Sequence, residues 1–188
     1  MNNELNLNRR SVLGAFAGIA TITAAPAYAG VFGYVKGAGN IRSIHMRSTR
    51  SGETLNTIYW IEGQYINPAL KEINWFMRDW RENKAVTMDR RTSDVIAAAH
   101  KRLDSSEAVM MLSGYRSPRT NAMLRSKSRR VAKDSYHIKG MATDFRIPSR
   151  SVSQIAKAAL ASRTGGVGKY YGSNFVHVDS GPIRTWTS

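Results

Sequence analysis

Apolar residues fall at helical spacing in four stretches of the chain. In each stretch they recur three or four positions apart, which places them on one face of a helix. A proline near the start of two stretches fits the first helical turn, where its missing N–H costs no hydrogen bond. In the first stretch the apolar face includes Trp75, Met77 and Trp80. The predicted helices cover residues 68–83, 92–103, 117–124 and 151–162.

Shorter stretches are rich in β-branched and aromatic residues or alternate apolar with polar ones, as strands do. Residues 41–46 and 54–61 are expected to form a hairpin joined by Ser51-Gly52. Further strands are predicted at residues 107–113, 141–147, 166–171 and 174–179. Helices mixed with short sequential strands favour an α+β fold over a doubly wound parallel sheet. We predict a single α+β domain with a small antiparallel sheet flanked by about four helices.

Composition restricts the possible partners and metal ligands. The 188 residues carry a formal net charge of +15, which suits an anionic partner. The basic residues are scattered and no nucleic-acid fold signature is present, so no nucleic acid partner is expected. Segment 125–133 is basic and leads directly to Ser135 and His137, where it could form a cationic lip. The absence of cysteine excludes thiolate metal ligands, disulfides and a cysteine-linked lipid anchor.

The N-terminal segment is typical of a secretory signal peptide. Arg9-Arg10 precedes an apolar stretch over residues 12–25, and Ala27-Tyr28-Ala29 is a small-x-small cleavage site. The paired arginines resemble the twin-arginine signal, and an ordinary Sec signal is the alternative. The apolar stretch is shorter than the roughly 20 residues that a membrane span needs, so no stable membrane anchor is expected. We predict a signal peptide at residues 1–29 and a periplasmic domain at residues 30–188.

Two histidines and two aspartates form the pattern with the clearest chemistry. His137 and Asp144 are followed by His177 and Asp179, and two imidazoles with a carboxylate are a standard set for catalytic zinc. On one helix, residues seven apart lie about 10.5 Å apart, too far to share an ion. We therefore place His137 on a loop, with Gly140 offering a bend, and Asp144 on the next strand. On a strand, His177 and Asp179 face the same side. The alternative is a pair of unrelated structural histidines.

Several motifs recur in a fixed order along residues 41–186. The first is Ser-Gly-Tyr-Arg-Ser at residues 113–117, and the last two are Gly-Gly-Val-Gly at 165–168 and Asn-Phe-Val-His at 174–177, closed by Gly181-Pro182. Between them lies Ser-x-His-x-x-Gly-x-Ala-x-Asp, filled by Ser135, His137, Gly140, Ala142 and Asp144. Together they resemble the YcbK-like (MepK-type) murein endopeptidase branch of the D-Ala-D-Ala metallopeptidases, in the lysostaphin and hedgehog-like superfamily.

The resemblance implies roles for particular residues. It implies zinc held by His137, Asp144 and His177, on a small antiparallel sheet. Many relatives carry an acid or histidine shortly before the last ligand, where this chain has Asn174 and Phe175. Neither side chain can accept a proton from water.

Three further residues are candidates for the site. Asp179 is expected either to be the general base or to orient His177 through a hydrogen bond. Arg116 is expected to pair with a substrate carboxylate or stabilise the oxyanion. Ser135 could contact the substrate backbone or form a turn.

The expected function is hydrolysis of amide bonds in peptidoglycan cross-links by a zinc-activated water. Two alternatives remain at this stage. One is a D-Ala-D-Ala-type carboxypeptidase, which trims a free stem end. The other is a non-catalytic protein that binds zinc or the cell wall, which the missing acid before His177 would fit.

Overall fold

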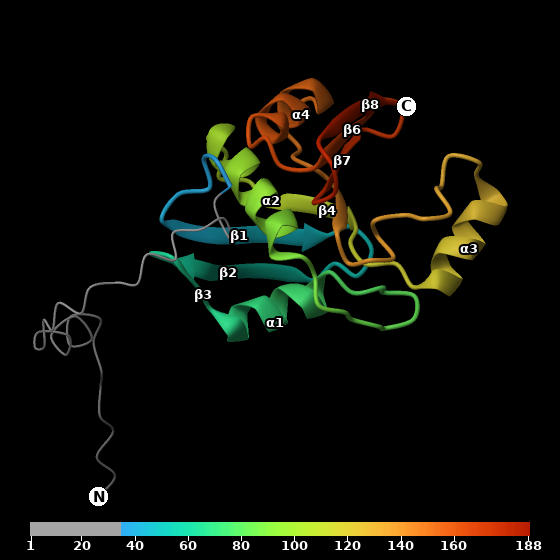
Figure 1. Ribbon diagram of the computed structural model, residues 1–188, viewed down its shortest axis with the longest axis horizontal. Coiled ribbons are helices and arrows are strands. Elements are labelled where there is room, and N and C mark those ends of the chain that lie inside the picture. Colours follow the sequence, from blue (N-terminus) through green and yellow to red (C-terminus); the bar gives the residue numbers. More distant parts are fainter. Residues whose placement is uncertain (1–34) are drawn as a thin grey trace, which may run out of the picture. The chain divides into compact units, whose positions relative to one another are not determined.

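The strands of the protein assemble into one mixed sheet (Figure 1). The computed structural model describes residues 35–188, and the predicted signal peptide lies outside them. The strands are β1 (Ile41–Ser48), β2 (Thr54–Ile61), β3 (Gln64–Tyr65), β4 (Val109–Ser113), β5 (Ala142–Arg146), β6 (Gly166–Tyr170), β7 (Phe175–Asp179) and β8 (Arg184–Thr187). Their order across the eight-stranded sheet is β3-β2-β1-β4-β5-β7-β6-β8.

The pairing confirms the α+β prediction and corrects the predicted sheet. β1 and β2 form the expected antiparallel hairpin, and buried residues alternate with exposed ones along most of β1. The central strands β4, β5, β7 and β6 pair antiparallel. β1 pairs parallel with β4, however, and β6 pairs parallel with β8, so the whole sheet is larger and mixed. Parallel pairing joins strands distant in sequence, and local patterns carry no signal for it.

Four helices flank the described sheet, and three of them have clear N-terminal caps. Asp89, Ser117 and Ser151 each accept a backbone N–H of the helix that follows, and Ser151 forms a capping box with Gln154. These caps explain why the sequence pattern located the helix starts within one or two residues. The helices are α1 (Asn67–Phe76), α2 (Arg90–Arg102), α3 (Pro118–Lys127) and α4 (Val152–Leu160).

The first helix ends earlier than the sequence pattern predicted. α1 stops at Phe76, whereas the prediction extended it to residue 83. The Asp79 carboxylate accepts the backbone N–H groups of Arg81 and Ser117, at 3.0 and 2.9 Å. Those bonds stabilise a turn that competes with further helix. Asp79 thereby fixes the chain leading into α3.

The early end of α1 also changes the fate of its predicted apolar face. Met77 is buried as expected, but Trp75 and Trp80 are 50% and 44% exposed. Arg78 lies over the Trp75 ring and Arg81 over the Trp80 ring, each 4.4 Å from the centroid. The assignment of both tryptophans to the core was therefore wrong, because Trp75 lies off the buried face of α1 and Trp80 lies in the turn after the helix, each beneath an arginine.

Most of the core lies between the sheet and two helices. α2 and α4 pack against each other, α2 contacts β1 and β7, and α4 contacts β6 and β7. The buried set is mainly aliphatic and includes Ile96, Ile155, Val176 and Val178. α3 and the loop after it project from the side of the sheet (Figure 1). Over residues 35–188, no helix has the length and apolar character needed to cross a membrane.

Candidate metal centre

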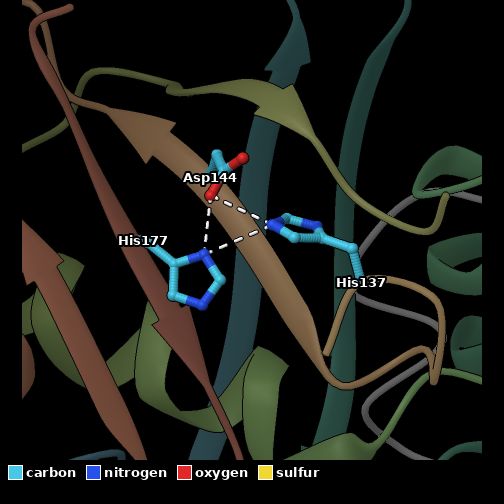
Figure 2. Close-up of side chains that lie close together, drawn as sticks. All are labelled: His137, Asp144 and His177. Atoms are coloured by element: carbon cyan, nitrogen blue, oxygen red, sulfur yellow. Dashed lines mark hydrogen bonds and ion pairs between the residues drawn. The ribbon is translucent and has the colours of Figure 1, made fainter. Parts of the chain in front are cut away.

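Three predicted ligand side chains converge on one point (Figure 2). Asp144 on β5 and His177 on β7 are direct partners in the antiparallel register, so their side chains share one face of the sheet. His137 reaches the same point from the loop before β5. The candidate ligand atoms are His137 Nε2, Asp144 Oδ1 and His177 Nδ1, all within 4.8 Å of one another. All three residues are buried.

The loop that carries His137 is a compact set of turns. The backbone N–H groups of Ile138 and Lys139 donate to the carbonyls of Ser135 and Tyr136. The turn closes at Gly140, whose φ of +67° belongs to the left-handed region that favours glycine. A side chain there would also meet the Thr87 carbonyl, with a Cβ–O distance of 2.9 Å. Gly140 thus provides the bend that the sequence predicted.

Hydrogen bonds on the outer side of each ring fix which nitrogen faces the centre. His137 Nδ1 lies 2.7 Å from the Gly114 carbonyl oxygen, which can only accept, so this nitrogen carries the proton. His177 Nε2 lies 3.0 Å from Asp179 Oδ2 and is likewise the donor. The opposite nitrogens, His137 Nε2 and His177 Nδ1, therefore present lone pairs inward. They do so beside a carboxylate oxygen that is also an acceptor.

The spacing of these acceptors fits a zinc ion. Tetrahedral ligands bound at about 2.0–2.1 Å lie about 3.3 Å from one another. His137 Nε2 is 3.2 Å from Asp144 Oδ1 and 3.3 Å from His177 Nδ1, and the remaining edge measures 2.8 Å. Three lone-pair atoms so close together repel unless a proton or a metal cation lies between them. Imidazole nitrogen and carboxylate oxygen are also ligand types that zinc prefers.

Protonation at the centre follows from burial and from these contacts. Burial lowers the pKa of His137, which keeps the ring neutral and able to bind a metal near pH 7. Burial also acts to lower the pKa of His177. In the metal-free site, however, a second proton on Nδ1 can be donated to Asp144, and this bond and the one to Asp179 outweigh burial and raise the pKa. Burial would raise the pKa of Asp144, yet His137, His177 and Arg116 hold it well below its usual range. The site therefore favours positive charge at its centre.

Asp179 lies on the far side of His177 from the convergence point. Its side chain has no exposed surface and accepts hydrogen bonds from His177, Arg184 and the backbone N–H groups of Gly166 and Gly181. These donors overcome the effect of burial and lower the pKa of Asp179, so it is ionised near neutral pH. The carboxylate is thus fully used in holding the His177 ring.

Arg116 and Ser135 both line the cavity in front of the ligands and also bind the protein. Arg116 Nη2 donates to Asp144 Oδ2 at 2.6 Å and its Nε donates to Ser113 Oγ at 2.9 Å. Arg116 therefore holds the second oxygen of the ligand carboxylate. Ser135 Oγ accepts the backbone N–H of His137 at 3.3 Å, the geometry of the turn-forming alternative.

The ligand set opens onto a cavity of about 390 Å³. Aromatic rings and arginines form much of its wall, with Tyr170 and Phe175 stacked at a centroid distance of 4.4 Å. The wall also includes residues of the segment between α3 and His137, among them Ser128, Arg130 and Val131. The other two of the chain's four histidines, His45 and His100, lie outside this wall.

Sequence reasoning missed the contribution of β8. Arg184 binds Asp179 through two nitrogens, at 3.0 and 2.7 Å, and lies over the rings of Tyr136 and Trp186. The ring centroids of Trp186 and His177 lie 5.3 Å apart. The indole also covers Gly168, where an added Cβ would come within 2.5 Å of it. The sequence did contain a signal for this contact. Arg184 follows the Gly181-Pro182 motif by two residues, close enough in the chain to Asp179 to pair with it.

An α+β domain that presents two imidazoles and a carboxylate at the wall of an open cavity is typical of metal-dependent hydrolases. Comparison with known proteins agrees with that class. A sequence model described as peptidoglycan L,D-endopeptidase MepK matches residues 36–186, so the chain belongs to this peptidase family.

Individual relatives are similar over most or all of their length. Peptidoglycan L,D-endopeptidase MepK of Escherichia coli (strain K12) is 39% identical over 186 residues, which cover 98% of this chain and 100% of the relative. A relative of the same name from Shigella flexneri matches equally. Probable peptidoglycan L,D-endopeptidase MepK of Haemophilus influenzae is 40% identical over 146 residues, 77% of this chain and 78% of the relative. No solved structure matches the chain significantly.

Proposed function

We propose that this protein is a zinc-dependent endopeptidase that hydrolyses L,D peptide bonds in peptidoglycan. The observation that carries the proposal is the convergence of three inward-facing lone pairs from His137, Asp144 and His177, in a chain of this family. Both histidine tautomers are fixed from outside by the Gly114 carbonyl and by Asp179. A site organised in this way binds a cation without first rearranging its rings.

The side chains at the site have separate roles in this proposal. Zinc bound by the three ligands would polarise the scissile carbonyl and lower the pKa of a water molecule. Asp179 holds the His177 ring and keeps its Nδ1 lone pair directed inward. Arg116 holds Asp144 and borders the cavity, so its guanidinium can stabilise negative charge that develops on the substrate.

Asp179 is better suited to orient His177 than to act as general base. A base must come within about 2.6–3.2 Å of the proton it removes. Asp179 is fully buried and engaged by four donors on the side of His177 that faces away from the cavity. We therefore propose the orienting role.

An endopeptidase is favoured over the two alternatives. The cavity opens to solvent and its wall includes several aromatic rings and arginines, which suits a peptide that continues on both sides of the cut. The relatives are named endopeptidases, and a carboxypeptidase would need only a closed pocket for one chain end. Ordered ligands would fit a non-catalytic zinc protein as well, and what disfavours that alternative is that the relatives are named endopeptidases.

Digestion of isolated peptidoglycan tests the proposal. The zinc-loaded protein should release muropeptides whose masses correspond to cleavage at an L,D bond, identified by mass spectrometry. His177→Ala, purified in parallel, should release none above background. Release of only terminal D-alanine would support the carboxypeptidase, and no release by zinc-loaded wild type would contradict both enzymes.

We also propose that the protein acts outside the cytoplasm, because its relatives act on peptidoglycan by name and Arg9-Arg10 and Ala27-Tyr28-Ala29 form an export pattern. Replacing both arginines by lysine separates the two routes, since twin-arginine export requires the pair and Sec export tolerates lysine. The periplasmic yield of the double variant should fall to background. An unchanged yield would assign the protein to Sec.

A further inference from the structure

The segment between Arg116 and Ser135, two residues of the cavity wall, is strongly basic. Residues 118–133 contain six basic residues and no acidic one. All six side chains are exposed. Arg119 has one distant pairing, 3.7 Å from Glu82, and within residues 35–188 the other five form no ion pair with a carboxylate. We call this segment, α3 with the chain that returns from it, the basic arm.

The basic arm contributes little to the core. Only Thr120 and Asn121 of α3 are buried, and Figure 1 shows the helix and the following loop projecting from the sheet. A helix that serves stability normally buries an apolar face, which α3 lacks. Charged side chains concentrated on a projecting element instead suit contact with a partner outside the molecule.

The arm is nevertheless fixed at its base. Ser117 caps α3 by accepting the N–H of Thr120 at 3.0 Å. The Asn121 side-chain amide donates to the carbonyls of Ala132 and Lys133, at 3.0 and 3.4 Å, and so joins the helix to the returning chain. These contacts hold the two limbs together, so the exposed cations are presented on an ordered support.

The returning limb of the arm is also part of the site. Ser128, Arg130 and Val131 line the same cavity as the three ligands, and the chain then continues into Ser135 and His137. A polymer lying along the arm would therefore reach the cavity without a gap. Arg130 is itself in the cavity wall, and Arg129 is its neighbour in the chain, so part of the arm's charge borders the site.

We propose that the basic arm binds the free carboxylates of neighbouring stem peptides in peptidoglycan and so holds the polymer while one stem enters the cavity. The inference rests on the proposed function for the identity of the polymer. Charge complementarity supports it, because stem peptides carry repeated carboxylates and the arm offers exposed cations without internal partners. Exposed charge pairs are individually weak, so several must act together.

A binding experiment with two matched variants tests the arm. The arm variant is Arg125→Gln, Lys127→Gln and Arg129→Gln, all outside the cavity wall. The control removes three exposed lysines from three other helices, Lys71→Gln, Lys101→Gln and Lys157→Gln. Both lose the same net charge. The full zinc-loaded chain is mixed with purified sacculi on ice at low salt, the sacculi are pelleted, and the bound fraction gives the affinity.

The arm variant should bind sacculi about tenfold more weakly than the control, as three exposed pairs of about 0.5 kcal/mol each would give. Amidating the carboxyl groups of the sacculi should lower wild-type binding to the level of the arm variant. Equal binding by the two variants, or wild-type binding that survives amidation, would overturn the proposal. So would arm-dependent binding to phosphatidylglycerol vesicles with none to sacculi.

Hydrolysis of soluble cross-linked muropeptides by wild type separates this inference from the proposed function. If wild type cleaves them and the two variants bind sacculi equally, only the role of the arm is wrong. If wild type cleaves nothing, the proposed function is wrong, whereas the pelleting result still reports on the arm. Circular dichroism of both variants checks that each remains folded.

Discussion

Two buried aspartates in this protein have opposite surroundings. Asp94 has no exposed surface: Arg42 Nη1 forms an ion pair with it at 2.8 Å, and the Tyr59 and Tyr65 hydroxyls donate hydrogen bonds to it at 2.9 and 2.6 Å. Its lone pairs are satisfied inside the protein. This cluster joins α2 to β1, β2 and β3, and its chemistry is complete without a ligand.

Asp144 is almost as deeply buried but is only half satisfied by donors. Arg116 donates to Oδ2, whereas Oδ1 faces His137 Nε2 and His177 Nδ1, nitrogens whose protons lie on the far sides of the rings. A group of acceptors aimed at one point beside a cavity needs a cation. The direction of the donors, rather than burial or the presence of an arginine, therefore separates a structural cluster from a metal centre.

The largest expected effect is loss of stability at the Asp94 cluster. Asp94→Ala leaves Arg42 buried without its carboxylate, and breaking a buried pair in this way costs about 3–5 kcal/mol. Urea unfolding should show this decrease in the free energy of unfolding. The variant protein that remains folded should bind zinc as wild type does. A matching loss of zinc affinity would mean that the two clusters are coupled.

The second effect is loss of metal at the site. His177→Ala removes one of three ligands and should weaken zinc binding about 10²- to 10³-fold, because each ligand contributes part of the total binding free energy of a protein zinc site. Metal content after gentle purification, followed by a competition titration, measures the change. His100→Ala is the matched control and should keep its zinc. Retention of zinc by His177→Ala would argue against the ligand set.

A smaller effect is expected where Asp179 holds the ligand. Asp179→Asn should weaken zinc binding about 10- to 100-fold, because the amide holds the imidazole less well and Arg184 loses its charged partner. Muropeptide hydrolysis should recover as zinc is added. A general base would behave differently, since turnover would then stay about 10²-fold or more below wild type at saturating zinc.

Tyr65→Phe tests the satisfied cluster more gently. Loss of the hydroxyl that donates to Asp94 Oδ2 should lower the free energy of unfolding by about 1–2 kcal/mol. Chemical denaturation measures it, with zinc content as the second readout. Tyr170→Phe, at the cavity wall, is the comparison. A change in zinc content in Tyr65→Phe, with stability unchanged, would reverse the assignment of the two clusters.

The smallest effect is a pH dependence in the zinc-free protein. Without metal, hydrogen bonds to Asp144 and Asp179 outweigh burial and raise the pKa of His177 above its ordinary value of 6.5. A group with a raised folded pKa stabilises the fold fully below its unfolded pKa, and that stability is lost as pH rises through the folded pKa. Unfolding of the chelated protein should therefore become easier as pH rises above 6.5. Excess zinc should abolish the trend, and a trend of opposite sign would contradict the assignment.

The helices, the strands and the chemical types of the site residues follow from short stretches of the chain. Caps at Asp89, Ser117 and Ser151 act within one turn, so the helix starts could be predicted from neighbouring residues. The bend at Gly140 and the shared strand of His177 and Asp179 are likewise local properties. Where a side chain's partners lie within a few residues, the period of the helix or strand is enough to predict which side chains share a face.

How those side chains meet depends on contacts between segments that are distant in the chain. The pairing of Asp144 with His177 depends on the register of β5 against β7, which is set by burial on both strands. The Gly114 carbonyl behind His137 and Arg184 behind Asp179 come from other segments. The same dependence explains the early end of α1 and the exposed tryptophans. Long-range contacts select one geometry from several that the local sequence permits, and that selection fixes which lone pairs face the cavity.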